Sequence, residues 1–182
     1  PMDCPQHKIV SLVGNIATDG SATLYDVVSR VADTVKAPHY PMPLPVIATT
    51  VQDKAILLSQ KPVRNVLELG RQADVTFVGI GVMGDDAALI RDGFVKPEEM
   101  RALVKAGAAG EIIGWAYDAE GQLIEGLTND RVVSAPLEQP AKRRVIGIAM
   151  APPRLRAVKG ALIGKLINGL ITNEKMAELL LK

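Results

Sequence analysis

Residues 75–84 read VTFVGIGVMG, an apolar run that ends in a glycine-rich turn. The apolar part, 75–80, is the clearest signal of a buried strand in the chain. Similar apolar runs occur at 8–13, 145–150 and 169–172, and amphipathic helical patterns occur at 21–35, 49–58, 62–72, 97–105 and after Pro152. Because strands that alternate with helices require crossover connections, we predict an α/β fold with a mainly parallel sheet and helices on both of its faces.

One insertion interrupts this alternation. Residues 112–117 and 122–125 predict two strands around a turn at 118–121, and therefore a β-hairpin. The proline-rich stretch 37–45 leaves room only for a short edge or terminal strand at 39–42. Residues 131–135 are a further candidate strand. Ser21 and Asn173 are predicted to cap the helices that follow them.

The composition fits one globular domain. The chain has 182 residues, of which 48% are hydrophobic and 23% charged, and these fractions exclude disordered and fibrous classes. Its 21 Lys and Arg against 20 Asp and Glu leave a net charge of +1. This balance gives no electrostatic footprint for nucleic acid or for an anionic membrane, so any charged ligand must be bound by a small local site.

The few cysteine and histidine residues exclude several kinds of site. A single cysteine, Cys4, allows no intramolecular disulfide framework and no cysteine-rich metal site. His7 and His39 lack the spacing of a zinc enzyme, and neither can be paired with a serine or cysteine nucleophile. We therefore expect no metal and no cofactor. No apolar run approaches the ~18 residues of a membrane span, and the first residues do not resemble a signal peptide, so a cytoplasmic protein is the default expectation.

Ligands of parallel α/β sheets bind at the carboxyl ends of the strands, where helix N-termini present free N–H groups. This rule selects four turns before any family is considered: Gly14-Asn15, the turn from Gly79 to Gly81, residues 150–154 and residues 172–173.

The turn 79–84 also matches the GxGxxG fingerprint of dinucleotide-binding proteins. However, Asp85 and Asp86 would place negative charge beside a pyrophosphate, and the acid required ~20 residues later falls on a helix start at 98–99. A nicotinamide or flavin site is therefore disfavoured. A turn that lines another ligand and a turn that is only structural both stay open.

Most charged residues, Asp92 among them, are expected to be solvated. Glu111 and Arg154 are the two exceptions. Glu111 follows a glycine- and alanine-rich turn and precedes an apolar strand, so its carboxylate could point into the crevice and accept hydrogen bonds from sugar hydroxyls. Arg154 lies in the first helical turn after 145–150, where a cation opposes the helix dipole. That cost is explained if the guanidinium and the helix N-terminus bind an anion together. A solvent-facing arginine is the alternative.

Five segments occur in an order that resembles a known family: DGSATLYDVVSRVA at 19–32, VTFVGIG at 75–81, AAGEIIGWAYDAEGQLIE at 108–125, TNDRVVSAPLE at 128–138 and GLITNEKMAELLL at 169–181. Together they resemble the C-terminal effector-binding domain of SorC-type bacterial transcriptional regulators, over almost the whole chain. The resemblance implies a Rossmann-like α/β fold of the group that includes ribose-phosphate isomerase, glucosamine-phosphate deaminase and CoA-transferase. It also implies a non-catalytic domain that binds a sugar, polyol or sugar phosphate and so changes the regulator's affinity for its operator.

The resemblance assigns ligand contacts by position: strand-end loops at Gly14, Asn15, Gly79 and Gly81, an acid for sugar hydroxyls at Glu111, and a cation near a ligand phosphate at Arg154. It implies that operator DNA is bound through an N-terminal helix-turn-helix, in a homo-oligomer. An isomerase or deaminase of the same fold is the rival function. Glu111 could act as its base, but no histidine is placed beside it to act as the acid.

Two departures from the family pattern modify this expectation. Family members carry an Ala-Gly-Gly turn before the position of Arg154, whereas residues 149–153 read AMAPP, so the glycines that let an anion approach are absent. This favours an unphosphorylated sugar or polyol. The chain also begins, at Pro1, with what resembles a later strand, so we expect it to lack the helix-turn-helix and the first βαβ unit of the family.

Overall fold

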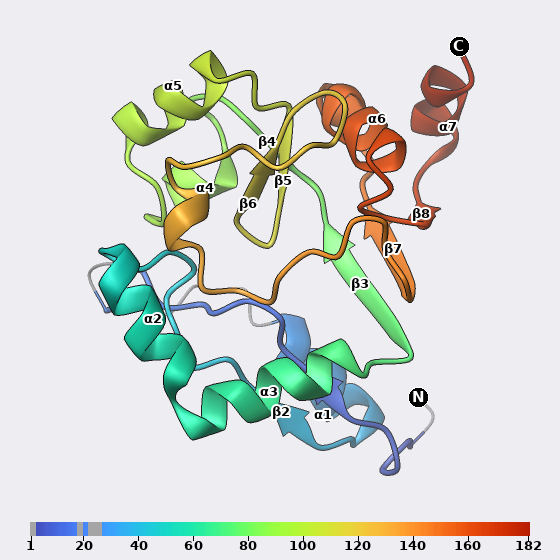
Figure 1. The fold of residues 1–182 in the computed structure, drawn as a ribbon. Coiled ribbons are helices and arrows are strands. Elements are labelled where there is room, and N and C mark those ends of the chain that lie inside the picture. Colours follow the sequence, from blue (N-terminus) through green and yellow to red (C-terminus); the bar gives the residue numbers. More distant parts are fainter. Residues whose placement is uncertain (1–2, 18–19, 22–26) are drawn as a thin grey trace.

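The computed structural model describes residues 3–17, 20–21 and 27–182, and within them the strands form three small sheets (Figure 1). The first is a parallel pair of β1 (Ile9–Val10) and β2 (His39–Tyr40). The second is parallel with the order β3–β7–β8, and its strands span Val75–Gly79, Arg144–Ile148 and Gly169–Ile171. The third is antiparallel with the order β4–β5–β6, and its strands span Gly81–Val82, Gly110–Ile112 and Trp115–Tyr117. The α/β class is confirmed. The prediction of one mainly parallel sheet is wrong for the described residues, because no strand among them joins β1 to β3.

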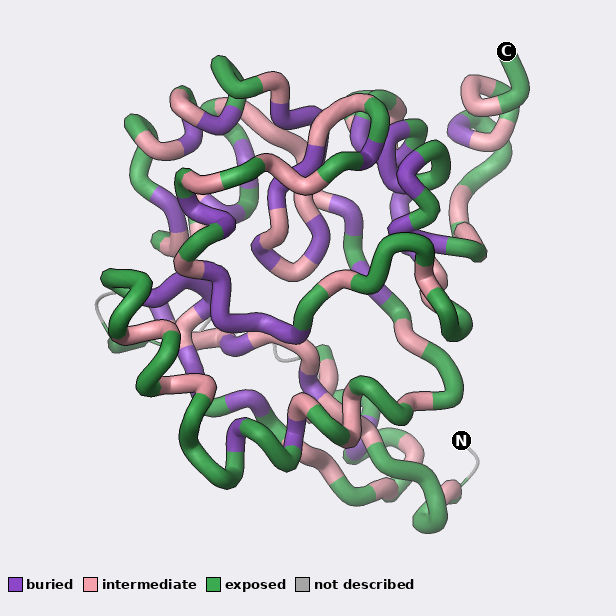
Figure 2. The backbone as a smooth tube through the Cα atoms, viewed as in Figure 1, coloured by how far each residue is buried: buried purple, intermediate pink, exposed green. Residues whose placement is uncertain are grey.

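One face of the sheet β3–β7–β8 is covered by helix α6 (Leu155–Ile163). Val78 of β3 lies in the core on this side, among the buried residues Ile80, Tyr117, Val158, Ala161, Leu166 and Ile167. The other face carries side chains that the register places in adjacent rows, Phe77 beside Ile146 and Ile148 beside Ile171. Phe77 is 56% exposed and Ile171 is 48% exposed. Along β3, exposed residues alternate with less exposed ones (Figure 2). The prediction of helices on both faces is therefore wrong for the described part of the chain, since nothing in it covers this apolar face.

Most of the helices agree with the sequence pattern. Besides α6, they are α1 (Val27–Val35), α2 (Val51–Ser59), α3 (Lys61–Arg71), α4 (Ala88–Arg91), α5 (Pro97–Lys105) and α7 (Glu174–Leu180). The predicted bounds of α5 are confirmed, and the short helix α4 was not predicted. The predicted cap of α7 is also confirmed, because the Asn173 side chain accepts a hydrogen bond of 3.1 Å from the Met176 N–H. Residues 22–26 of the helix predicted at 21–35, Leu24 among them, lie outside the described residues, as does the start that Ser21 was predicted to cap.

The predicted hairpin exists, but its turn lies elsewhere. Strands β5 and β6 are joined at Ile113 and Gly114, which have φ values of 46° and 90°. Positive φ at both central residues is the conformation of a type I′ hairpin turn, and glycine adopts it without steric cost. Residues 118–121 do form a turn, since the Asp118 N–H donates to the Gln122 carbonyl. The strand predicted at 122–125 is wrong, because the segment forms only an isolated bridge between Tyr117 and Leu123.

Residues 129–135 connect the sheets instead of forming the strand expected at 131–135. They begin with a 3-10 turn, η1 (Asn129–Arg131), and then form an isolated antiparallel bridge between Val132 and Ile47. Val132 and Val133 are fully buried. The Ala135 N–H donates to the Leu12 carbonyl at 2.7 Å, so this segment holds the region of β1 beside the antiparallel sheet.

Candidate ligand-binding site

The structure brings all six predicted site residues to one cavity. This cavity, of about 450 Å³, is lined by residues that include Gly14, Asn15, Gly79, Gly81, Glu111 and Arg154. They come from the loop after β1, the end of β3, the strands β4 and β5, and the 3-10 turn η2 (Pro152–Arg154) that precedes α6. The cavity therefore lies where the carboxyl ends of parallel strands meet, as expected for an α/β ligand site.

Glu111 is fixed at this cavity by its neighbours in the antiparallel sheet. Its Oε2 accepts a hydrogen bond of 2.8 Å from the Gly114 N–H in the turn of its own hairpin. Its Oε1 lies against Gly81, the residue opposite it in β4, so closely that a Cβ on Gly81 would be 1.9 Å from that oxygen. Burial raises the pKa of the Glu111 carboxyl, and the hydrogen bond from Gly114 opposes this effect only in part. The arrangement presents a poorly solvated acid to the cavity.

A buried tyrosine lies beneath this acid. The Tyr117 hydroxyl donates to the Ala157 carbonyl at 3.0 Å, and the residue is fully buried. Burial, and then the nearby charge of Glu111, raise the pKa of Tyr117 above its ordinary value. Tyr117 is therefore neutral, and its contact ties the strand that pairs with Glu111 to helix α6.

Arg154 supplies a positive charge to the cavity. Its Nε donates to the Ile80 carbonyl at 3.1 Å, and it forms no ion pair with any carboxylate in the described part of the chain. It ends the 3-10 turn η2 and is the N-cap of α6, rather than a residue of the first α-helical turn. Pro152 and Pro153 have no N–H, and the Arg154 N–H donates to the Ala151 carbonyl at 2.9 Å. The Leu155 N–H donates to the Pro152 carbonyl, so residues 152–155 offer no free N–H group to a phosphate, unlike the usual anion site.

The glycines and Asn15 contribute in different ways. Gly14 is required by packing, because a Cβ there would lie 1.7 Å from the Leu44 carbonyl oxygen. Gly79 is exposed, and a Cβ there would meet nothing within 4 Å, so space above it is open. The Asn15 side chain forms no hydrogen bond within the described residues. Its amide is available to a molecule in the cavity.

The dinucleotide interpretation of residues 79–84 is wrong. In a nucleotide-binding fingerprint the glycine-rich turn leads directly into a helix whose N-terminus binds the pyrophosphate. Here the turn after β3 leads into strand β4, whose Gly81 pairs with Glu111. Gly79 and Gly81 nevertheless line the cavity, whereas Gly84 is not among its lining residues. Of the two alternatives left open by the sequence, the turn that lines a ligand cavity has structural support.

The cavity lining also contains residues that sequence reasoning missed, among them Ser11, His39, Asp92 and Phe94. The Ser11 Oγ and the His39 Nε2 lie 3.3 Å apart, within hydrogen-bond distance. The expectation that neither histidine can be paired with a serine is therefore wrong for His39. Asp92 was expected to be solvated, but it lines the cavity. The strand-end rule could have found Ser11, which directly follows the carboxyl end of β1, but not His39, which is the first residue of β2.

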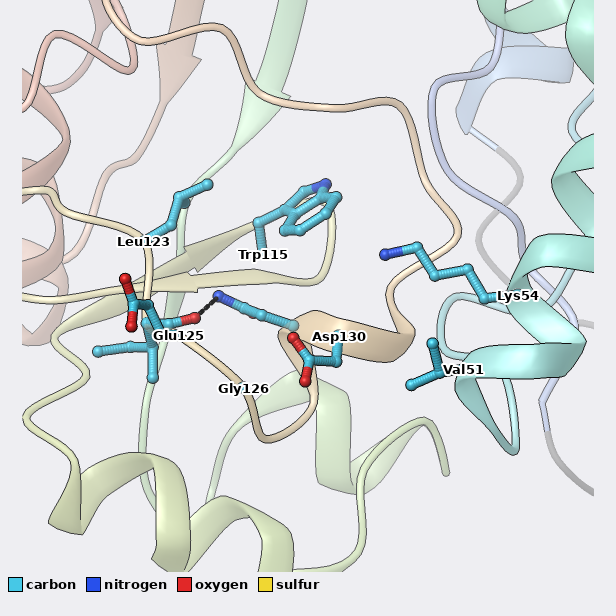
Figure 3. Close-up of a pocket in the computed structure, with 9 residues that line it drawn as sticks. Val51, Lys54, Trp115, Leu123, Glu125, Gly126 and Asp130 are labelled. Carbon is cyan, nitrogen blue, oxygen red and sulfur yellow. Dashed lines mark hydrogen bonds between the residues drawn. The ribbon is translucent and has the colours of Figure 1, made fainter.

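A second hollow, of about 490 Å³, lies beside Trp115 and contains none of the predicted site residues (Figure 3). Its ammonium, indole and amide groups are already engaged, whereas the carboxylates of Glu125 and Asp130 form no ion pair within the described residues. The Lys54 Nζ lies 5.2 Å from the centre of the Trp115 ring, the indole N–H donates to the Ala135 carbonyl, and the Asn129 amide donates to the carbonyls of Ala116 and Ile124. We therefore take the cavity at Glu111 as the candidate site.

Comparison with known proteins identifies the family of the chain. A family model described as "Putative sugar-binding domain" matches residues 1–182, the whole chain. The chain belongs to this sugar-binding domain family.

Relatives of this sugar-binding domain are transcriptional regulators. The chain is 31% identical over 174 residues to the erythritol catabolism regulatory protein EryD of Brucella abortus (strain 2308), and the aligned region covers 96% of this chain and 55% of that protein. It is 32% identical over 144 residues to the deoxyribonucleoside regulator of Bacillus subtilis (strain 168), covering 79% of this chain and 45% of that one. The structure of the full-length sorbitol operon regulator SorC from Klebsiella pneumoniae superposes with a TM-score of 0.87 at 25% identity, over 100% of this chain and 60% of that one.

These matches confirm the resemblance to SorC-type regulators. The homologues are transcriptional regulators and not enzymes, so the rival isomerase or deaminase function has no support, and the expected effector-binding domain is confirmed. The chain spans about half the length of the curated relatives it matches. Among the helices of the described residues, none is both long enough and apolar enough to cross a membrane.

Proposed function

We propose that the cavity at Glu111 holds a small sugar, polyol or sugar phosphate, and that its occupancy modulates DNA binding by a regulator of which this chain is the effector-binding part. One observation carries the proposal. An acid and a guanidinium, neither of them in an ion pair, line the same strand-end cavity together with an available amide. Charged groups that are left unpaired at a partly buried site need polar partners, and the hydroxyls of a carbohydrate would supply them.

Each residue has a distinct role in this proposal. Glu111 accepts hydrogen bonds from ligand hydroxyls, and Arg154 donates to ligand oxygens while its Nε stays on the Ile80 carbonyl. Asn15 can both donate and accept. Gly79 leaves room for the ligand to approach the backbone, and Gly81 leaves room for the Glu111 carboxylate. Gly14 contributes by holding the loop against Leu44 rather than by touching the ligand.

The remaining parts of the proposal concern the whole regulator. Its operator would be bound by an N-terminal helix-turn-helix outside these 182 residues, in keeping with relatives about twice as long. A first βαβ unit, also outside them, would cover the exposed apolar face around Phe77 and complete the sheets. A homo-oligomer that acts in the cytoplasm completes this scheme, since regulators of operators are usually symmetric.

The test measures ligand binding by the 182-residue chain and by Glu111→Gln. Thermal unfolding and titration calorimetry are recorded with erythritol, sorbitol, ribose and ribose 5-phosphate. A ligand that binds the folded state stabilises it by about 2.7 kcal/mol at a hundredfold excess over Kd. At least one of the four should raise Tm for the wild type and lose most of its effect in Glu111→Gln. Glu120→Gln is the matched control, because Glu120 is exposed and lies outside the cavity. Failure of all four ligands to bind, or equal binding by both variants, would contradict the proposal.

A further inference from the structure

The cavity contains a polar pair that the proposed function leaves unused. Ser11 directly follows β1, is 8% exposed, and its N–H donates to the Tyr40 carbonyl of β2 at 3.0 Å. Its Oγ lies 3.3 Å from the Nε2 of the half-buried His39. Both side chains line the same cavity as Glu111 and Arg154. We refer to these two residues as the Ser11–His39 pair.

The pair differs from the charged groups in both origin and chemistry. It comes from the β1–β2 sheet, whereas Glu111 comes from the antiparallel sheet and Arg154 from the turn before α6. No ion pair or carboxylate hydrogen bond to the His39 ring occurs in the described residues. The same lining also includes apolar side chains, among them Val13, Val46, Ile80, Phe94 and Ile113. The cavity thus offers a charged polar site, a second polar site built from a hydroxyl and an imidazole, and apolar surface.

This distribution matches one chemical class of ligand. A hydroxyl and an imidazole can each donate or accept a hydrogen bond, and so can the hydroxyl group of a polyol or sugar. A phosphate, in contrast, is bound most strongly by guanidinium groups and free backbone N–H groups; this pair has no guanidinium, and the Ser11 N–H is bonded to the Tyr40 carbonyl. The apolar lining suits the C–H surface between the hydroxyls.

We propose that the Ser11–His39 pair binds a hydroxyl of the effector at a distance from Glu111 and Arg154, and so determines which polyols or sugars the cavity accepts. The inference rests on the proposed function, because it requires that the effector occupy this cavity. One end of the ligand contacts the charged groups, and a hydroxyl towards its other end contacts the pair.

The experiment combines a ligand lacking one hydroxyl with variants lacking one partner. Calorimetric Kd values are measured for erythritol and butane-1,2,3-triol, and for sorbitol and 1-deoxysorbitol. Butane-1,2,3-triol has a hydroxyl at only one of its two ends. Because hydrogen bonds to charged groups are the stronger ones, we expect this end to bind Glu111 and Arg154 and the Ser11–His39 pair to be left without a ligand hydroxyl. Wild type should bind each deoxy analogue roughly tenfold more weakly than its parent, which is the effect of one hydrogen bond of about 1.4 kcal/mol.

Ser11→Ala and His39→Phe should weaken binding of the parent polyol by a similar, roughly tenfold factor and leave binding of the deoxy analogue unchanged. His39→Gln retains an N–H donor at similar reach and should recover most of the affinity of wild type. His7→Gln is the matched control, since His7 is exposed and lies outside the cavity lining. Melting temperatures establish that each variant is folded.

Two results would overturn the inference, and they differ. If Ser11→Ala and His39→Phe weaken the parent polyol and its deoxy analogue by the same factor, the pair acts only through the structure of the β1–β2 sheet, and the proposed function stands. If neither erythritol nor sorbitol binds to the wild type, the effector proposal fails for these polyols and the role of the pair fails with it.

Discussion

Replacing Gly81 by alanine tests the contact that places the acid at the cavity. A Cβ on Gly81 would lie 1.9 Å from Glu111 Oε1 and 2.7 Å from its carboxyl carbon, so the carboxylate must move. Its movement breaks the 2.8 Å hydrogen bond from the Gly114 N–H to Oε2. Overpacking of this kind costs about 1–3 kcal/mol, and a hydrogen bond to a charged group contributes about 1.5–3 kcal/mol. Since a single displacement of the side chain relieves the clash and breaks the bond together, we expect a total loss of about 2 kcal/mol.

The assay is urea unfolding followed by the fluorescence of Trp115, the one tryptophan of the chain. Gly79→Ala is the control, because a Cβ at Gly79 meets nothing within 4 Å, and its effect should stay within about 0.5 kcal/mol. In a Glu111→Ala background, Gly81→Ala should also cost no more than about 0.5 kcal/mol, since the obstacle is gone. Equal losses for Gly79→Ala and Gly81→Ala, or an undiminished loss in the absence of the Glu111 side chain, would refute the reasoning.

Three further predictions concern titration, capping and the two faces of the sheet. Burial raises the pKa of Glu111 above its ordinary 4.5, so the folded chain binds a proton at this carboxylate more readily than the unfolded chain does. The unfolding free energy of wild type relative to Glu111→Gln should therefore fall as pH rises above 4.5 through the raised pKa. Urea titrations that show this difference rising with pH would contradict the prediction. Asn173→Ala removes the acceptor of the Met176 N–H and should lower the unfolding free energy by about 1 kcal/mol; no change in the urea midpoint would exclude a capping role. Leu166→Ala, in the core that packs against the covered face of the sheet, should lower the unfolding free energy by about 3 kcal/mol. Phe77→Ser, on the opposite face, should change it by no more than about 0.5 kcal/mol in this chain. Similar losses for both variants would show that the Phe77 face is covered.

Elements with local signals could be predicted closely from the sequence. Helix α5 begins at Pro97, with Glu98 and Glu99 in its first turn, and Pro97 supplies a preset φ where no N–H bond is needed. The Asn173 cap likewise depends only on residues within one helical turn. Five of the six predicted cavity residues lie in turns that the strand-end rule selects, and that rule needs only the order of strands and turns, which the apolar runs provide. Glu111 was chosen separately, from the glycine- and alanine-rich turn before its strand.

The errors arose where a residue's role is set by distant contacts. Gly121 was expected only as the last residue of the hairpin turn, but a Cβ there would lie 2.3 Å from the Gly160 carbonyl oxygen, so this glycine also allows close packing against α6. The true turn contains Ile113 at a positive φ, which no propensity favours. His39 was missed because its partner, Ser11, is 28 residues away and is brought to it only by the parallel pairing of β1 and β2.

The arrangement of the sheets explains how a ligand in this cavity could shift the conformation of the protein. Asn15 follows β1, and Gly79 ends β3, yet these strands belong to sheets that no described strand joins. Glu111 lies on the third sheet and is placed by its hairpin, with the Gly114 N–H on one carboxylate oxygen. A ligand that contacts Asn15 and Glu111 together would therefore add polar links between sheets whose strands are not hydrogen-bonded to one another. Because a ligand shifts a conformational equilibrium only by its differential affinity for the two states, a site divided among separate sheets can distinguish their relative positions. A site confined to one rigid sheet could not, since its contacts would be the same in both states.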